Sequence, residues 1–338
     1  MLSEDDLELL DALQVNPRAS WTLIGQVLGI DPVTAARRWA RLRESGMAWV
    51  SVTLGPHELD QLCVAVVEVQ CEPGANAAIA ATLARWDCAV TVQHVAGTHD
   101  LFVVLVASDF ATMSGLSLVD LPAVRGVTRI RSHFVTRLFA TGRWRLHALN
   151  KEQVRRLREA YPQRSGERAR PFGPSDRALF RELSTDGRRT CAEVGERVGL
   201  SARTVQRRLT ALMARRELAF RCDVARTLLG WPSSAVLWLN VPDARIEEAG
   251  RVLGRRPEVR TCAAVADERN LLLTIGLRHV ADLHEHITGI LQDAPYARIM
   301  DRNVVLRQEK LYGRILDRSG RAVDALPIDP WTAPASVC

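Results

Sequence analysis

The feature that most constrains this 338-residue chain is an internal repeat. Gly195 follows Gly25 by 170 residues, and the same offset continues from the first fifty residues of each half to Leu101 and Leu271. Near its end the repeat slips by one residue, because Ile130 aligns with Ile299. Repetition over such a length indicates a tandem duplication in which both halves share one fold. Other aligned pairs are Asp6/Asp176, Leu13/Leu183, Gly29/Gly199, Thr34/Thr204, Arg37/Arg207, Arg38/Arg208, Leu42/Leu212 and Val95-Ala96/Val265-Ala266.

Each half begins with two short amphipathic helices separated by a tight turn. In the second half, residues 190–200 form a helix that ends at Gly199, and Ser201 is an N-cap for the next helix. The first half repeats this pattern over residues 20–31, with Pro32 at the first helical position, where a missing N–H is harmless. This order predicts a helix-turn-helix in each half, with its second helix as the DNA reader.

The outer faces of these second helices carry the candidate DNA contacts. In the later copy Val205, Leu209 and Leu212 recur at helical spacing and should face inward, so that the intervening side chains point outward. Arginine, glutamine and threonine can read base edges in a major groove, although a solvated helix face would show the same pattern. The predicted DNA-binding residues are Ser201, Arg203, Thr204, Gln206, Arg207, Arg208 and Thr210, with Thr34, Arg37, Arg38 and Arg41 in the first copy.

The two predicted readers differ. The outward positions of the first are Val33, Ala36, Arg37 and Ala40, which offer fewer hydrogen bonds than the second and suit thymine methyl groups and phosphates. Arg38 and Arg208 lie closer to the buried stripe, which indicates phosphate positioning or local packing. Two unequal readers in one chain predict recognition of an imperfect palindrome.

The region after each helix-turn-helix alternates strands and helices in the order β-α-β-β-α-β. In the first copy strands are expected at 62–71, 88–95, 101–106 and 126–139, with helices at 74–86 and 109–119. This is the ferredoxin-like motif. The predicted class is therefore α+β, with two helix-turn-helix domains alternating with two ferredoxin-like βαββαβ domains. The expected second copy has strands at 234–241, 259–265, 271–277 and 298–308 and helices at 244–255 and 280–291.

These patterns define six segments. The sequence between the halves is basic; it could form a helix at 151–161 and then an open linker that is either solvated or touches phosphate. The proline-containing tail should be weakly ordered. The segments are 1–50 and 175–222 (helix-turn-helix), 59–147 and 232–316 (βαββαβ), 148–174 (linker) and 317–338 (flexible tail).

Composition adds weaker constraints. The formal net charge is +6, which suits a polyanionic partner without requiring one. The seven cysteines include no C-x-x-C pair, as expected for reduced thiols. The acidic start does not have the pattern of a signal peptide, and no apolar run reaches the ~20 residues of a membrane helix. We therefore expect a cytoplasmic protein without a membrane partner.

The chain resembles the Lrp/AsnC (feast/famine) family of transcription regulators in a tandem-duplicated form. The match is carried by Asp6, Leu9, Leu10, Leu13, Ile24-Gly25, Leu28-Gly29-Ile30, Arg38, Leu42, Gly46 and Gly97-Thr98-His99-Asp100. In the second half it is carried by Asp176, Leu179, Leu183, Val194-Gly195, Val198-Gly199-Leu200-Ser201, Val205, Arg208 and Leu212. The resemblance implies RAM-type βαββαβ modules that pair through their sheets into homo-oligomers and bind small effectors, often amino acids.

The resemblance also places an effector site at the turn Gly97-Thr98-His99-Asp100. A glycine there allows close backbone approach, and the acid could accept a hydrogen bond from an α-amino group. The alternative is a hairpin turn that needs glycine and aspartate for geometry alone. In the second half Asp267 and Asn270 take the places of Gly97 and Asp100, and this departure from the motif leaves a second effector site open.

Two other functions compete with a ligand-responsive regulator. One is an enzyme similar to the sirohaem decarboxylases, which resemble this family; His94 and His99 lie near the relevant turn, but without a histidine-rich motif. The other is an architectural DNA-binding protein without ligand response. His284-Glu-His286 does not have the i, i+4 spacing of a helical metal site. We expect no catalytic residues, no metal and no cofactor.

Overall fold

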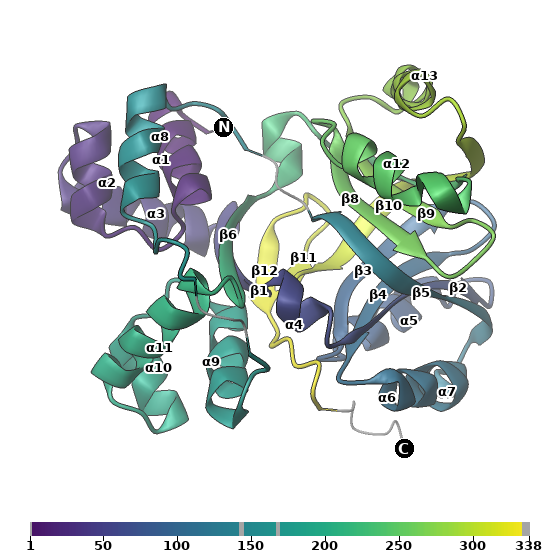
Figure 1. Ribbon diagram of the computed structural model, residues 1–338, viewed down its shortest axis with the longest axis horizontal. Coiled ribbons are helices and arrows are strands. Elements are labelled where there is room, and N and C mark those ends of the chain that lie inside the picture. Colours follow the sequence, from purple (N-terminus) through teal and green to yellow (C-terminus); the bar gives the residue numbers. More distant parts are fainter. Residues whose placement is uncertain (1, 142–144, 167–169, 333–338) are drawn as a thin grey trace. The chain divides into compact units, whose positions relative to one another are not determined.

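The computed structural model describes residues 2–141, 145–166 and 170–332, which fall into two compact units (Figure 1). The first unit contains residues up to Leu62, Arg145–Leu228 and Tyr312–Asp329. The second contains Cys63 to the end of the first βαββαβ copy, Leu229–Leu311 and, among the described residues, 330–332. Each unit therefore combines corresponding parts of both repeats, and each is described by itself.

The first unit holds both helix-turn-helix domains. Gly25 and Gly195 allow their close turns, because an added Cβ would lie 2.6 Å from the Ile30 carbonyl oxygen in one copy and 2.3 Å from that of Leu200 in the other. The predicted domains are confirmed in both halves. The first consists of α1 (Glu4–Val15), α2 (Trp21–Leu28) and α3 (Pro32–Glu44), and the second of α9 (Pro174–Thr185), α10 (Cys191–Val198) and α11 (Ala202–Ala214).

The strand after each helix-turn-helix pairs with its own duplicate. β1 (Ala48–Leu54) runs antiparallel to β6 (Leu218–Val224), and Ser51 lies opposite Arg221, its partner in the repeat. The side chains of two arginines repeat this reciprocity. Arg18 donates to the carbonyl oxygens of residues 187 and 189, while Arg188 donates to those of residues 17 and 19. Such mutual contacts define a two-fold relation between the domains.

Each helix-turn-helix domain is completed by a segment from later in the chain. The predicted linker helix is α8 (Lys151–Glu159), which packs on α1 and α2. The equivalent residues of the second half, 321–329, instead include β12 (Ala322–Ala325), which pairs with β11 (Arg314–Leu316) in a hairpin. Ser184 on α9 accepts a hydrogen bond from the Ile328 amide at 2.9 Å.

The C-terminal region therefore corrects two boundaries. Residues 312–316 belong to the helix-turn-helix unit rather than to a βαββαβ domain ending at 316. The expectation of a flexible tail over 317–338 is wrong up to residue 329, because backbone hydrogen bonds such as Ala322 N–H to the Gly46 carbonyl tie this region to the unit. Residues 333–338 lie outside the described residues.

The second unit is a closed ring of antiparallel strands from both repeats. Their order is β3-β4-β2-β5-β8-β9-β7-β10, and β10 pairs again with β3. The repeats join where β5 pairs with β8 and where β10 pairs with β3. The strands are β2 (Cys63–Cys71), β3 (Ala89–Ala96), β4 (Leu101–Ala107), β5 (Val127–Thr141), β7 (Ser233–Asn240), β8 (Val259–Val265), β9 (Leu271–Leu277) and β10 (Arg298–Leu311).

The one-residue slip in the repeat is a β-bulge. Ile130 lies opposite Val69 and Ile299 opposite Leu239, the equivalent of Val69. The next partners are Glu68 for residue 131 and Trp238 for residue 301, so Met300 is extra. The bulge restores the 170-residue offset for the rest of the strand.

Helices lie outside the ring, while apolar and polar side chains fill its interior. The outer faces of β7 and β9 pack on α12 and α13 (Figure 1). Inward-facing side chains of both repeats, including Phe102 and Trp238, form a second core. The first-copy helix expected at 109–119 continues to residue 123 through a π-helical turn. The helices are α5 (Asn76–Ala84), α6 (Phe110–Gly115), α7 (Leu121–Ala123), α12 (Ile246–Leu253) and α13 (Leu283–Asp293). The short α4 (Pro56–Leu59) belongs to the first unit.

Candidate nucleic-acid interface and effector site

Helix α11 presents the polar face that its sequence predicts. Ser201 caps it by accepting a hydrogen bond from the Thr204 amide at 3.2 Å. Val205, Leu209 and Leu212 are buried against the rest of the domain. This packing leaves the side chains of Arg203, Gln206, Arg207 and Thr210 exposed.

The exposed polar groups of α11 fall into two kinds. The Gln206 amide donates to the Thr210 hydroxyl at 3.3 Å and accepts from the Cys191 thiol at 3.1 Å, so its orientation is held by α10. Arg203 and Arg207, in contrast, have no carboxylate partner among the described residues. Their guanidinium groups are therefore available to phosphate or to guanine, the partners that arginine binds through paired donors.

Helix α3 offers less to a nucleic acid, as its sequence suggests. Val33 is 74% exposed, and Arg37 is exposed without an acidic partner among the described residues. Arg41 instead pairs with the buried carboxylate of Asp6. Burial would raise the pKa of Asp6, but hydrogen bonds from Arg41 and Ser3 outweigh it and lower that pKa.

The arginines nearest the buried stripe have local partners. Arg208 donates to Asp176 at 2.9 Å, and its duplicate Arg38 pairs with Asp5 at 2.7 Å. Both contacts fix the reader helix against the first helix of its domain. The structure therefore pairs these arginines with carboxylates of their own domains, while Arg37, Arg203 and Arg207 carry the unpaired positive charge.

The turn predicted as an effector site is tightly held. Gly97 has φ = 146°, and a Cβ at this position would lie 1.9 Å from Asn303 Oδ1. Asp100 accepts a hydrogen bond from the Cys71 amide at 2.8 Å. Its duplicate Asn270 accepts from the Val241 amide at 2.9 Å, so a neutral side chain holds the same turn in the second copy. Thr98 is exposed, whereas His99 is buried.

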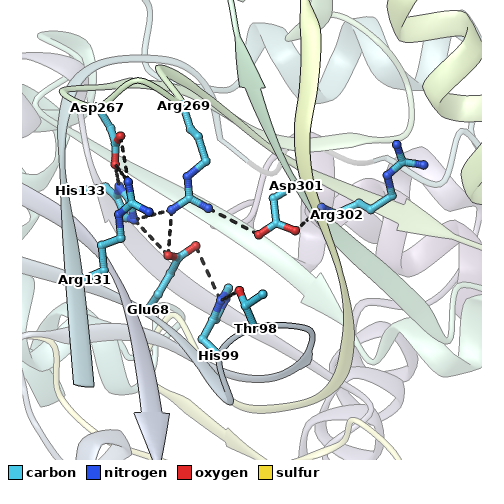
Figure 2. A network of polar contacts seen from close by, with 9 residues as sticks. All are labelled: Glu68, Thr98, His99, Arg131, His133, Asp267, Arg269, Asp301 and Arg302. Atoms are coloured by element: carbon cyan, nitrogen blue, oxygen red, sulfur yellow. Dashed lines mark hydrogen bonds and ion pairs between the residues drawn. The ribbon is translucent and has the colours of Figure 1, made fainter. Parts of the chain in front are cut away.

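Beside this turn lies a buried polar cluster that the sequence analysis did not predict (Figure 2). Glu68 Oε2 accepts from Arg269 at 2.9 Å and lies 3.3 Å from His133 Nε2, while Glu68 Oε1 lies 3.8 Å from His99 Nδ1. His133 Nδ1 lies 2.7 Å from Asp267, which also pairs with Arg131 at 3.0 Å. The cluster therefore joins strands and turns from both repeats.

The cluster alters the acidity of its members. Burial would raise the pKa of Glu68, but His133, Arg269 and His99 outweigh it and lower that pKa to about 2. Burial lowers the pKa of His99, and the nearby Glu68 opposes this effect only in part. Burial would likewise raise the pKa of Asp267, yet His133 and Arg131 hold it below its ordinary value. Glu68 is therefore an anion held by the Arg269 guanidinium of the second repeat and by two imidazole side chains of the first.

Two kinds of site were not found. Within the part of the chain that the structure describes, no group of three or more His, Cys, Asp or Glu side chains could hold a metal ion. Among the same residues, every helix is too short or too polar to cross a membrane.

Comparisons with known proteins agree with the division into repeats. Residues 2–43 and 175–213 match the AsnC-type helix-turn-helix domain, and residues 64–144 match the Lrp/AsnC ligand binding domain. The HTH-type transcriptional regulator LrpA of Mycobacterium tuberculosis is 32% identical over 117 residues, which are 34% of this chain and 78% of that protein. An uncharacterized HTH-type transcriptional regulator of Pyrococcus furiosus is 24% identical over 137 residues, 40% of this chain and 93% of that protein.

A solved structure matches the duplicated arrangement as a whole. The siroheme decarboxylase NirDL superposes with a TM-score of 0.59 over 91% of this chain and 93% of that chain. The sequences are 15% identical, so this likeness concerns the fold alone.

Proposed function

Because the chain belongs to the Lrp/AsnC family, we propose that it is a sequence-specific DNA-binding transcription regulator that reads DNA with α3 and α11. The observation that carries this proposal is the exposed face of α11, where Arg203 and Arg207 stand unpaired beside an oriented Gln206. A solvated helix face can also carry unpaired arginines, but two of them beside an amide held by the neighbouring helix provide the donors and acceptors that base reading requires. We expect such a regulator to act in the cytoplasm.

The proposed DNA site is an imperfect palindrome. The Ser51–Arg221 pairing and the reciprocal Arg18 and Arg188 contacts relate the two helix-turn-helix domains by a two-fold relation. Two-fold related readers fit inverted half-sites. Since α3 presents Val33 and Arg37 where α11 presents Arg203 and Arg207, the half-sites would differ in sequence, and α11 would provide more of the specificity.

The regulator would respond to an amino acid or a related small metabolite bound near Gly97–Asp100. In support, this turn lies within residues 64–144, which match a ligand binding domain. Thr98 is exposed at the turn, and the cluster around Glu68 lies directly beneath it. The proposal also includes self-association into a homo-oligomer through the sheets of the βαββαβ domains.

The test is selection of DNA from a random library by the purified chain. The proposal predicts enrichment of one motif with two unlike, inverted halves. Arg203→Ala/Arg207→Ala should enrich this motif less than the control variant Arg85→Ala/Arg129→Ala does. The control removes two exposed arginines that lie in the other unit. Addition of single amino acids should change the affinity for the selected motif. Enrichment of no motif would refute sequence-specific recognition.

The fold match to NirDL supports a second candidate, a sirohaem-decarboxylase-like enzyme. The interior core around Trp238 and the ion pairs of Glu68 occupy the ring, and an unpaired arginine face on α11 would have no role in such chemistry. Titration with haem and sirohaem distinguishes the candidates. A regulator should give no saturable absorption change, whereas a stoichiometric change would favour the enzyme.

A further inference from the structure

A basic cleft lies on the first helix-turn-helix domain. Its residues belong neither to the reader helix α3 nor to the predicted effector turn. It has a volume of about 550 Å³ and lies between the segment that precedes α8 and α8 itself. Its walls include the cationic side chains of Arg145, Lys151, Arg155 and Arg158 and the apolar side chains of Leu149 and Val154. Clefts of this size hold small organic ligands rather than single ions.

The cleft is built into the domain. Asp11 on α1 is fully buried and accepts hydrogen bonds from the Arg145 guanidinium at 2.6 and 2.9 Å and from the Leu149 amide at 2.8 Å. Gln14 accepts a further bond from the backbone of residue 146. On the other wall, Asn16 donates to the Leu157 carbonyl. Both walls are therefore fixed to α1 before any ligand arrives.

The cleft holds more positive charge than its acids balance. Arg145 is paired with Asp11, and Arg155 lies between Glu152 and Glu159. Lys151 and Arg158 have no carboxylate partner among the described residues. Two unpaired cations beside the buried apolar side chains of Leu149 and Val154 suit a ligand with both an anionic and an apolar part.

We propose that this cleft binds a phosphate-bearing ligand through Lys151, Arg158 and the outer edge of Arg145. Phosphate suits such a pair of side chains. Arginine donates two parallel hydrogen bonds to its oxygens, and the lysine ammonium group neutralises its negative charge. It could be carried by a free nucleotide or by the backbone of DNA bound to the first domain. The inference does not depend on the effector turn or on α11.

The position of the cleft links it to the first reader. Gln153 donates to the Val27 carbonyl and Arg156 to that of Gln26, at the end of α2 and just before the turn that leads into α3. A ligand that fixes α8 would therefore stabilise this helix-turn-helix. In the second half the residues equivalent to α8, 321–329, form β12 and the segment after it, and Ile328 takes the place of Arg158. The ligand would thus act on one of the two readers.

The experiment compares the full chain with Lys151→Ala/Arg158→Ala, using Arg85→Ala/Arg129→Ala as the matched control. ATP and inorganic phosphate are titrated by calorimetry, and binding of a random-sequence DNA duplex is measured over a salt series. A free nucleotide as ligand predicts ATP binding that the double variant weakens at least tenfold. DNA as the source predicts no ATP binding, but a salt slope smaller by about 1.8 in the double variant, for two lost phosphate contacts.

The inference is overturned if the double variant matches the control in both the ATP and the DNA measurements. Inorganic phosphate alone should compete with ATP only at high concentration, because it does not reach the apolar wall. The ATP titration needs no operator, so failure of sequence-specific DNA recognition would leave its outcome readable. Circular dichroism of each variant confirms that it is folded.

Discussion

Substitution of Glu68 by glutamine should destabilise the second unit in a pH-dependent way. The Glu68 carboxylate is 7% exposed and is held by Arg269, His133 and His99. Its pKa of about 2 lies below the ordinary value of 4.5. Since each tenfold change in acidity corresponds to 1.36 kcal/mol, this lowering represents about 3 kcal/mol of stability at neutral pH.

The direction of the pH effect follows from the lowered pKa. The folded state holds the carboxylate ionised more firmly than the unfolded state, so the stabilisation is complete above pH 4.5 and is lost as the pH falls toward 2. The free energy of unfolding of Glu68→Gln should therefore lie about 3 kcal/mol below that of the original chain at pH 7. At pH 3 the difference should fall to about 1.5 kcal/mol.

Urea denaturation followed by circular dichroism at pH 7 and pH 3 measures both differences. Glu72→Gln is the matched control, because Glu72 is exposed at the end of the same strand region. The reasoning is refuted if Glu68→Gln is as stable as the control at pH 7. A loss of stability that does not change with pH would show that the side chain stabilises by packing rather than by its charge.

Three further predictions concern the reader and the turn. Arg203→Ala/Arg207→Ala should weaken specific DNA binding, measured by fluorescence anisotropy, by roughly 1–3 kcal/mol for each lost base contact. Arg208→Ala should mainly lower the melting temperature, because it leaves Asp176 without its ion pair. If both variants changed DNA affinity and melting temperature equally, the assignment of different roles to these arginines would be wrong. Asp100→Asn should leave the melting temperature unchanged, since Asn270 holds the equivalent turn, and should abolish any response to amino acids; a variant that still responds would exclude Asp100 from the effector site. Gly97→Ala should lower the free energy of unfolding by about 1–3 kcal/mol, because its φ is positive and Asn303 occupies the space of a Cβ; a variant of undiminished stability would show that the turn rearranges.

Much of the fold could be predicted because local patterns specify it. Capping residues and apolar spacing give the helix bounds, and the buried stripe of Val205, Leu209 and Leu212 determines which side of α11 is exposed. The repeat offset predicted equivalent elements in both halves. Even the slip at Ile130 and Ile299 was visible in the sequence, although only the strand register identifies it as a bulge at Met300.

What could not be predicted depends on contacts between distant segments. Nothing in the local pattern of Glu68 or His133 shows that their partners are Arg269 and Asp267, because β5 meets β8 only when the ring closes. Similarly, the polar and proline-containing C-terminal region has the composition of a loose tail. It is ordered because Gly46 and Ser184, far away in the sequence, accept its backbone hydrogen bonds.

The most direct test of the account is binding of the purified chain to the DNA upstream of its own gene, with scrambled competitor DNA and a series of salt concentrations. The account predicts tight binding that resists the competitor and weakens steeply with salt, and a footprint that reverses when the two half-sites are exchanged. Binding with no preference over scrambled DNA, on this fragment and on a motif selected from a random library, would contradict it.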